Sequence, residues 1–422
     1  MRIDQDYVLL IGADLPTRER AILCTARALN KPTVLLAYPG EYTAQLRRPG
    51  FALADDIIVK PYLLNPRVAL EAIKEYERKT GFKPAAIVPV NDFVLPAGAT
   101  IAAYAGAPFL ADEVIVRCRD KLLMKNTLSA AGLRVARTIA VDEEVSCYEW
   151  KNEERLIFKP STFGGSGGVK MVKNVEELKS AIADAQSLLK KYEDILYIDP
   201  RRMHLEEYLA SEQEVSVEVY CTPLGATAVA VTEKMLSPPP YFAEIGHVVP
   251  YKGADCRVIV DAAERACRAL GIDRGVAHAE IRMVDGVPYV VEVGARPAGG
   301  KIVDLVFRAT GVDLYALHAK AYVSEFEKEF ARPSSVHVAA ISFMKAPPGL
   351  ITAISTPTLP EQVHGIAIYK GIGEKSAPYA RDFETREGHI EWQWQDGENV
   401  PDLLKITDDL AQEIFQVQGI DE

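Results

Sequence analysis

The chain has 422 residues, of which 48 are basic and 59 acidic, so its formal net charge is −11. This length accommodates about two to four domains. The negative balance argues against a sequence-independent nucleic-acid surface and against an anionic-membrane surface. Because no apolar run approaches the roughly 20 residues of a membrane span, we expect a cytoplasmic protein that binds neither nucleic acid nor a membrane.

The six cysteines are scattered along the chain. They form no C-x-x-C pair and have no histidine at zinc spacing. We therefore expect reduced, mostly buried thiols, and none of them is singled out as a nucleophile.

Strand and helix patterns alternate through the N-terminal part of the chain. Apolar strands are expected at residues 7–11, 33–37 and 85–90, and helices at 17–29 and 66–80. This order is typical of an open parallel sheet, whose ligands lie beyond the carboxyl ends of the strands. Those ends fall near Gly12–Asp14 and Asn91-Asp92. No G-x-G-x-x-G motif follows the first strand, so a nicotinamide oxidoreductase is a distant alternative.

A helical pattern with Asp120 at its N-cap follows a short helix at residues 100–104 and ends near Gly132. Basic residues at a helix start oppose the helix dipole, so Lys121 is expected to serve another purpose there. The alternative for Lys121 and Lys125 is an ordinary solvated helical face. A strand is expected next, at residues 134–140.

A glycine-rich loop joins a strand at residues 156–160, which carries Lys159, to an extended segment at 169–172. Backbone N–H groups in such a loop approach a ligand closely and suit phosphate oxygens. The loop is not a Walker loop, which needs G-K-[ST] before a helix. The alternative is a flexible turn. A helix is expected at 175–192.

Two later segments carry polar groups that suit a ligand cleft. In the strand at 214–220, Glu214, Ser216 and Glu218 alternate with valines, so its carboxylates share one face. An ordinary half-exposed strand is the alternative. After a strand at 227–232, a polyproline loop leads to Glu244 and His247, which we expect to line a substrate pocket. For His247 the alternative is a packed loop histidine.

Residues 278–293 read as a β-hairpin that follows a helix at 254–270. Its apolar residues occupy odd positions in both arms, which predicts a three-residue loop, Val284-Asp285-Gly286, with Gly286 left-handed. Glu280 and Glu292 then share a face, and two carboxylates held together suit Mg²⁺. Arg296 could reach the same space. The alternative is a solvent-facing sheet edge.

Beyond the hairpin, helices are expected at 302–310 and 314–330. Residues 334–422 are rich in β-formers, with strands at 336–344, 365–369 and 390–394 and a closing helix at 403–415. We find no catalytic constellation there. This segment is expected to form a small sheet that packs on the core, at a dimer interface.

Taken in order, these motifs resemble the ATP-grasp superfamily, and most closely its carboxylate–amine ligases of the L-amino-acid ligase type, over roughly residues 1–330. The resemblance implies a multidomain α/β and α+β fold. A Rossmann-like parallel-sheet domain would span 1–115, an ATP-grasp small subdomain with a glycine flap 116–203, the catalytic subdomain 204–330, and a β-rich C-terminal part 331–422. It also implies a homodimer.

The resemblance implies roles for individual residues. ATP phosphates would contact Lys121, Lys159 and the flap residues Gly164, Gly165, Ser166, Gly167 and Gly168. Adenine would lie against Glu206 and the backbone of Glu207, Tyr208 and Leu209. Glu214 would bind the ribose, with Glu212 as a weaker candidate, because the spacing from Glu207 to Glu214 is about one residue longer than the usual family pattern. Glu280 and Glu292 would ligate one or two Mg²⁺ ions, for which Mn²⁺ can substitute, and Arg296 would stabilise the tetrahedral intermediate. The substrate residues would be Glu244, His247, His278, Arg296, Gly299 and Gly300.

The implied activity is ATP-dependent ligation. A carboxylate, expected to belong to an amino acid, would be activated as an acyl phosphate and coupled to an amine, with ADP and phosphate released. Many family members carry Asn where this chain has Gly294, which favours the amino-acid ligase branch and leaves a second ion with fewer protein ligands. The alternatives are another acceptor (bicarbonate, a thiol or carrier protein, a purine-pathway amine) and a non-catalytic ATP-binding regulator. Glu280, Glu292 and Arg296 together argue against the regulator.

Overall fold

The computed structural model describes residues 5–14, 18–46, 53–141, 150–151, 154–196, 198–199, 201–211, 213–327 and 330–419. Glu212, the second candidate for the ribose, and Cys147 lie outside these residues. The other five cysteines have free thiols, and all but Cys256 are buried. In the part of the chain that is described, no helix has the length and apolar character needed to span a bilayer.

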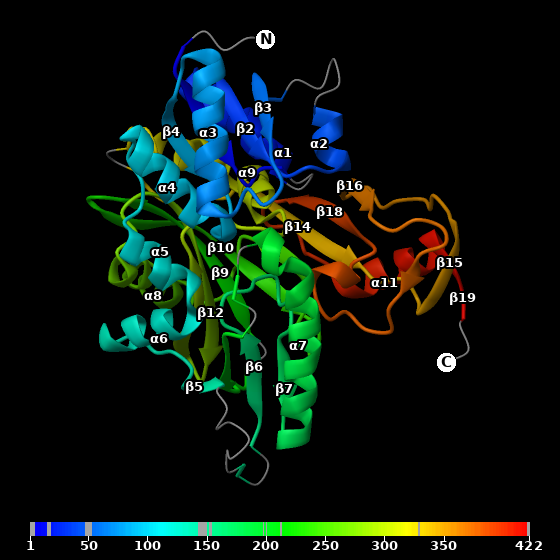
Figure 1. Ribbon diagram of the computed structural model, residues 1–422. Helices are drawn as coiled ribbons and strands as arrows, with labels where there is room; N and C mark the ends of the chain where they lie inside the picture. Colours follow the sequence, from blue (N-terminus) through cyan, green and yellow to red (C-terminus); the bar gives the residue numbers. More distant parts are fainter. Residues whose placement is uncertain are drawn as a thin grey trace.

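The N-terminal part forms the expected parallel sheet, with strand order β3-β2-β1-β4 (Figure 1). Odd residues of β1 pack with α3 and α4, and even residues pack with α1 and α10, so both faces of the sheet are covered. The sequence did not indicate α2 or β3, which are only six and four residues long. The elements are β1 (Tyr7–Ile11), α1 (Glu19–Leu29), β2 (Thr33–Ala37), α2 (Glu41–Leu46), β3 (Asp56–Val59), α3 (Pro66–Thr80), β4 (Pro84–Pro89), η2 (Asp92–Val94) and α4 (Leu95–Ala105).

Two short helices, α5 (Asp112–Arg119) and α6 (Lys121–Ala130), lead into a second sheet. The predicted cap is confirmed: Asp120 Oδ1 accepts hydrogen bonds from the N–H groups of Leu122 at 3.0 Å and Leu123 at 3.2 Å. The four antiparallel strands that follow have the order β5-β8-β6-β7, and we call them the flap sheet. Its elements are β5 (Thr138–Val141), β6 (Leu156–Pro160), β7 (Lys170–Val172), α7 (Val175–Leu196) and β8 (Met203–Glu207).

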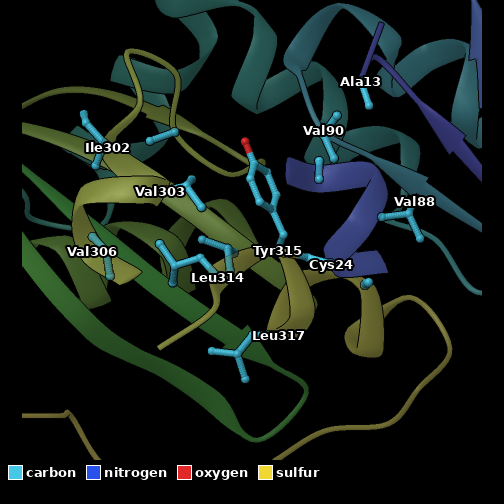
Figure 2. Packing of buried hydrophobic residues seen from close by; sticks show 14 of the residues in the cluster. Ala13, Cys24, Val88, Val90, Ile302, Val303, Val306, Leu314, Tyr315 and Leu317 are labelled. Carbon is cyan, nitrogen blue, oxygen red and sulfur yellow. The ribbon is translucent and has the colours of Figure 1, made fainter. Parts of the chain in front are cut away.

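An eight-stranded sheet, the central sheet, forms the middle of the molecule, with strand order β13-β12-β9-β10-β11-β14-β18-β16. Apolar residues of β9 and β12 pack against α8, α5 and α6 on one face, while α9 and α10 cover the other face beside the N-terminal sheet (Figures 1 and 2). The elements are β9 (Glu214–Thr222), β10 (Gly225–Leu236), β11 (Glu244–Val249), α8 (Cys256–Leu270), β12 (Gly275–Val284), β13 (Val287–Gly294), α9 (Ile302–Thr310) and α10 (Leu314–Ala321).

The hairpin of β12 and β13 is confirmed, but the predicted three-residue loop is wrong. Val284 pairs with Val287, so Asp285 and Gly286 form a two-residue turn, in which both have positive φ angles of 48° and 77°. Asp-Gly favours this turn because its twist matches the twist of the strands. The register then shifts after Glu280, which restores the parity of the apolar face.

The helix predicted at 314–330 is too long. Its first part is α10, which ends at Ala321. Ser324, three residues further on, has a left-handed backbone with φ 61°, which a continuing α-helix does not allow.

Three strands of the C-terminal segment extend the central sheet, because β14 pairs with β11, β18 with β14, and β16 with β18. The sequence predicted that strands at 336–344, 365–369 and 390–394 form a separate small sheet. This is wrong, because these strands are β14, β16 and β18 of the central sheet; the small sheet that is present has the order β17-β15-β19, whose strands the sequence did not indicate. Strand pairing joins this segment to the core, whereas the domain limits at residues 115, 203 and 330 stay a prediction. The elements are β14 (His337–Met344), β15 (Gly349–Ile354), β16 (Val363–Ile368), β17 (Lys375–Ser376), η4 (Phe383–Thr385), β18 (Gly388–Gln395), α11 (Leu403–Ile414) and β19 (Phe415–Gln418).

Candidate active site

A pocket opens between the flap sheet and the central sheet. Many of the residues that the sequence assigned to a nucleotide, a metal or a substrate line this single pocket. They are Lys121, Lys159, Gly164, Gly165, Ser166, Gly167, Glu206, Glu207, Leu209, Glu214, Glu244, Glu280 and Glu292.

Glu206 on β8 is the centre of a buried charge cluster. Its Oε1 atom lies 3.1 Å from Lys125 Nζ and 2.9 Å from His204 Nε2, and its Oε2 atom lies 2.8 Å from Lys159 Nζ. Ser161 Oγ lies 3.0 Å from the other ring nitrogen of His204. Burial alone would raise the pKa of Glu206, but the two ammonium groups hold it well below its usual range. The solvated-face alternative is therefore wrong for Lys125, which is 2% exposed.

We expect Glu206→Gln to destabilise the fold, because the substitution leaves two buried ammonium groups without a carboxylate. Removing one partner of a buried ion pair costs about 3–5 kcal/mol. A glutamine still accepts hydrogen bonds, so the free energy of unfolding in urea should fall by about 3 kcal/mol, the lower end of that range.

The matched control for this variant is Glu207→Gln on the neighbouring residue. The Glu207 side chain is 37% exposed, and its nearest cation is Arg137 Nε at 3.9 Å. Its loss should change stability by less than about 0.5 kcal/mol. Equal stabilities of the two variants would contradict the central role of Glu206.

Glu280 and Glu292 lie directly opposite each other on β12 and β13, so they share a face as the sequence predicted. Lys121 Nζ lies 3.0 Å from Glu292 Oε1. His278 links the pair to a third carboxylate, because its ring nitrogens lie 2.6 Å from Glu218 Oε1 and 3.3 Å from Glu280 Oε1. Burial would lower the pKa of His278, but the two carboxylates raise it to about 9.

These two carboxylates are a suitable but incomplete donor set for a magnesium ion. Among the described residues, no group of three or more His, Cys, Asp or Glu side chains is arranged to hold a metal. Mg²⁺ commonly binds through one or two carboxylates and takes its other ligands from water and nucleotide phosphates. Glu280 and Glu292 therefore fit an ion whose shell a bound nucleotide completes.

Lys234 on β10 is a pocket residue that sequence reasoning missed. Its ammonium group lies 2.7 Å from Glu280, 2.8 Å from Glu244 and 3.3 Å from Glu214, and the residue is 6% exposed. The sequence shows no clean alternation there, since the exposed Glu233 lies between Thr232 and Lys234 on β10; the position is identified by its pairing with Glu214 of β9. One buried cation thus holds together three carboxylates that the sequence had assigned to different roles.

The glycine loop between β6 and β7, which we call the flap, is tightly packed against the rest of the chain. A Cβ atom added at Gly165, where φ is +66°, would lie 3.0 Å from the Phe383 ring, and one at Gly167 would lie 2.3 Å from Phe163. Gly168 packs on Pro160 and lies outside the pocket lining. A side chain at position 165 would therefore press on the Phe383 ring, and one at position 167 would collide with Phe163. Through Phe383, the flap contacts the C-terminal segment.

The residues assigned to adenine and ribose lie on one side of the pocket. Leu209 lines it, whereas Tyr208 packs its ring against Phe242 with centroids 5.9 Å apart. Glu214 faces the pocket, and its Oε2 atom lies 3.6 Å from Arg282 Nε. Arg282 was not among the predicted site residues.

Arg296 lies next to the end of β4, where the parallel sheet was expected to present a ligand site. Its Nε atom donates a hydrogen bond of 2.7 Å to Asp92 Oδ2, and its Nη1 atom donates one of 3.2 Å to the Pro297 carbonyl oxygen. Burial would lower the pKa of Arg296, but Asp92 raises it above the usual value. The predicted guanidinium is thus charged and fixed in position.

The other predicted substrate residues lie beyond Arg296. A Cβ atom at Gly300 would be 2.8 Å from His247 Nε2 and 3.9 Å from Glu244 Oε2. His247 is wholly buried, and among the described residues neither ring nitrogen has a hydrogen-bond partner; Nε2 lies 3.7 Å from Glu244 Oε2. Burial lowers the pKa of His247 to about 3. Arg386, from the segment in which no site residue was expected, donates a 3.3 Å hydrogen bond to Glu244.

The family model described as the ATP-grasp domain matches residues 153–304. The chain is 25% identical over 285 residues to the uncharacterized protein y4rH of Sinorhizobium fredii, covering 66% of this chain and 57% of that protein. It is 26% identical over 194 residues to dapdiamide A synthase of Enterobacter agglomerans, covering 44% of each. It therefore spans about half the length of these curated relatives.

Among solved structures, the L-amino acid ligase from Bacillus licheniformis superposes with a TM-score of 0.74 at 20% identity, covering 99% of this chain and 100% of that chain. The two proteins therefore share one fold. The expected fold class and the resemblance to ATP-grasp proteins of the L-amino-acid ligase type are confirmed.

Proposed function

We propose that this chain, whose residues 153–304 form an ATP-grasp domain, is an ADP-forming ligase that joins a carboxylate to an amine. The carboxylate oxygen would attack the γ-phosphorus of ATP, and the bond to ADP would break. The amine nitrogen would then attack the acyl phosphate, releasing phosphate and a proton. The main observation in favour is that Glu280 and Glu292 share a pocket with Lys121, Lys159 and the flap.

In this proposal the lysines and the flap bind the triphosphate. Lys121 and Lys159 carry charge that would neutralise phosphate oxygens. The flap residues Gly164, Gly165, Ser166 and Gly167 line the pocket, so their backbone N–H groups are available to a phosphate. One or two Mg²⁺ ions, or Mn²⁺ in their place, would be held by Glu280 and Glu292 and would neutralise the charge that spreads over the transferred group. ATP and the divalent ion are thus the proposed cofactors.

Arg296 would stabilise the oxyanion that forms when the amine attacks. A guanidinium is permanently charged and presents several donors in a fixed plane. Asp92 and the Pro297 carbonyl occupy two of these donors, which leaves the other terminal nitrogen for the reacting oxygen.

The substrates proposed for this site are small molecules, namely an amino acid as the carboxylate and an amine as the acceptor. One of the curated relatives carries the name of a synthase for dapdiamide A, and the similar solved structure carries the name of an L-amino acid ligase. Assembly as a homodimer stays a prediction, which light scattering in solution would test.

The decisive experiment measures ADP and phosphate release from ATP and Mg²⁺ with amino acids offered singly and in pairs. Mass spectrometry of the same mixtures identifies the products. We expect amino-acid-dependent ADP release and a coupled product that is lighter than the sum of its substrates by one water. Release of AMP would refute the acyl-phosphate mechanism, and coupling to bicarbonate or a thiol would refute the amine acceptor.

A further inference from the structure

Arg18, immediately before α1, is a buried cation without a matching carboxylate. The residue is 9% exposed, and its Nη1 atom donates a hydrogen bond to the Val90 carbonyl oxygen at the end of β4. Within the described residues no carboxylate forms an ion pair with it, and Asp14 and Asp92 attract it only from a greater distance. Burying an unpaired charge is costly, so such a group normally has a partner.

Two other arginines in this part of the molecule, Arg20 and Arg296, each form an ion pair with a carboxylate. Arg20, two residues along, pairs with Asp304 at 3.0 Å and Asp313 at 3.2 Å. Arg296 pairs with Asp92 at 2.7 Å. The unmatched charge at Arg18 is therefore specific to this position.

Arg18 faces the same glycine pair that adjoins the predicted substrate residues. A Cβ atom built at Gly299 would meet a single atom within 4 Å, namely Arg18 Nη2 at 3.9 Å. At Gly300 the corresponding neighbours are His247 and Glu244. The two glycines thus lie between Arg18, which is at ordinary contact distance from Gly299, and His247, which lies close to Gly300.

Tyr315, on α10, carries a hydroxyl whose charge state is influenced by Arg18. Figure 2 shows the Tyr315 ring rising from α10 with its hydroxyl at the end away from Leu317. Burial raises the pKa of Tyr315 to about 12, and the charge of Arg18 opposes that rise, so the hydroxyl keeps its proton. A guanidinium and a phenol together offer the directed N–H and O–H donors that a carboxylate accepts.

We propose that Arg18 and Tyr315 bind a substrate carboxylate other than the one that is activated. This inference rests on the proposed function, because it concerns a substrate lying over Gly299 and Gly300 beside Arg296. The carboxylate would belong either to an amino acid that serves as the amine or to an acyl donor with a second acidic group. Either source supplies the negative charge that Arg18 lacks, and the product of the reaction keeps it.

The test compares substrates with and without that carboxylate, in the full-length protein and in Arg18→Gln. Each acidic substrate is compared with an analogue in which that carboxylate is replaced by a carboxamide. The replacement is made first in the amine substrate and then in the acyl donor. In the wild type, blocking one of the two carboxylates should raise KM by about 10-fold to 100-fold, the value of a charge-assisted hydrogen-bonded contact. A rise with the blocked amine identifies the amine as the source, and a rise with the blocked donor identifies the donor.

In Arg18→Gln the KM difference between the acid and its carboxamide should disappear, while the KM for ATP stays the same. Tyr315→Phe should shrink the difference by less, because the guanidinium remains. Arg20→Gln is the matched control: it removes an arginine with carboxylate partners of its own and should retain the full preference for the acid. Thermal unfolding of each variant separates a binding effect from a loss of fold.

Three results would each overturn either the proposed function or the role of Arg18. Absence of ADP release by the wild type with every substrate pair refutes the proposed function. Normal ADP release by Arg18→Gln with an unchanged preference for the acid refutes the role of Arg18 and leaves the ligase standing. An equal rise of KM for the acid and its carboxamide in Arg18→Gln also refutes it, since a purely structural residue would act in that way.

Discussion

Glu292→Gln is expected to remove ligase activity while leaving the fold intact. The glutamine is the same size but carries no charge, so it is a poor ligand for Mg²⁺, which prefers charged oxygen donors. Loss of residues that merely orient a metal ligand lowers affinity or activity by about 10-fold to 100-fold. Because Glu292 would contact the ion directly, kcat should fall by more than about 100-fold.

The contacts of Glu292 explain why the variant should remain folded. Its side chain is 28% exposed, and its ion pair is with Lys121 at 3.0 Å. Lys121 also donates a 2.7 Å hydrogen bond to the Phe163 carbonyl oxygen, so its ammonium group keeps a partner when the charge is removed. An ion pair with one partly exposed partner contributes about 1 kcal/mol or less, and the thermal midpoint should shift by only a few degrees.

The measurement is ADP release as a function of Mg²⁺ concentration, with circular dichroism as a check on the fold. Glu264→Gln is the control, because Glu264 accepts a hydrogen bond from the Ala228 N–H at 2.9 Å and does not line the pocket. Full activity of Glu292→Gln at low Mg²⁺ would contradict the metal assignment. Loss of activity in both variants would point to a general effect on the fold.

The sequence predicted well which residues meet at the pocket, because these residues lie in short, ordered motifs. The glycine flap, the alternation around Glu214 and the hairpin with Glu280 and Glu292 each depend on neighbours a few residues apart. The hairpin also shows the limit of such patterns. The apolar residues at odd positions in both arms correctly predicted that the two carboxylates share a face. The same pattern arises from a two-residue turn with a bulge and from a three-residue loop, so it could not distinguish between them.

The residues that sequence reasoning missed owe their roles to contacts between distant segments. Lys125 looked like part of a solvated helix face because nothing near it in sequence shows that Glu206 packs against it. The place of Lys234 in the site becomes evident only in the folded chain, where three strands bring their carboxylates around its ammonium group. Asp92 is 204 residues from Arg296, and Arg386 is 142 residues from Glu244.

The sheet to which the C-terminal strands belong is also decided by contacts with distant segments. Its strands were recognised from β-forming residues, but the choice between a separate sheet and an extension of the central sheet depends on pairing partners. β14 pairs with β11 roughly ninety residues earlier in the chain, and no local pattern encodes that choice. Arg386 therefore contacts Glu244, a predicted substrate residue, from a segment in which no catalytic signal was recognised.

Arg296→Lys is expected to lower kcat about 100-fold to 1,000-fold, the usual cost of losing one oxyanion donor, with little change in the KM for ATP. A lysine keeps the charge but places it on a single flexible ammonium group, which cannot hold Asp92 and a reacting oxygen at once in fixed geometry. Arg296 is absent from the lining of the nucleotide pocket. The loss should therefore appear in the chemical step and not in nucleotide binding.

Product analysis separates this effect from the effect of Glu292→Gln. If Arg296 stabilises the oxyanion formed by amine attack, phosphoryl transfer should be less impaired than coupling, so Arg296→Lys should release more ADP than coupled product. Glu292→Gln should lower ADP and product together, because the metal acts on the first step. Arg268→Lys, at a half-exposed helix position paired with Glu264 at 3.8 Å, is the control and should match the wild type. Equal amounts of ADP and product from Arg296→Lys at a wild-type rate would assign the oxyanion to another donor. Arg18, whose charge attracts Asp92, is one candidate.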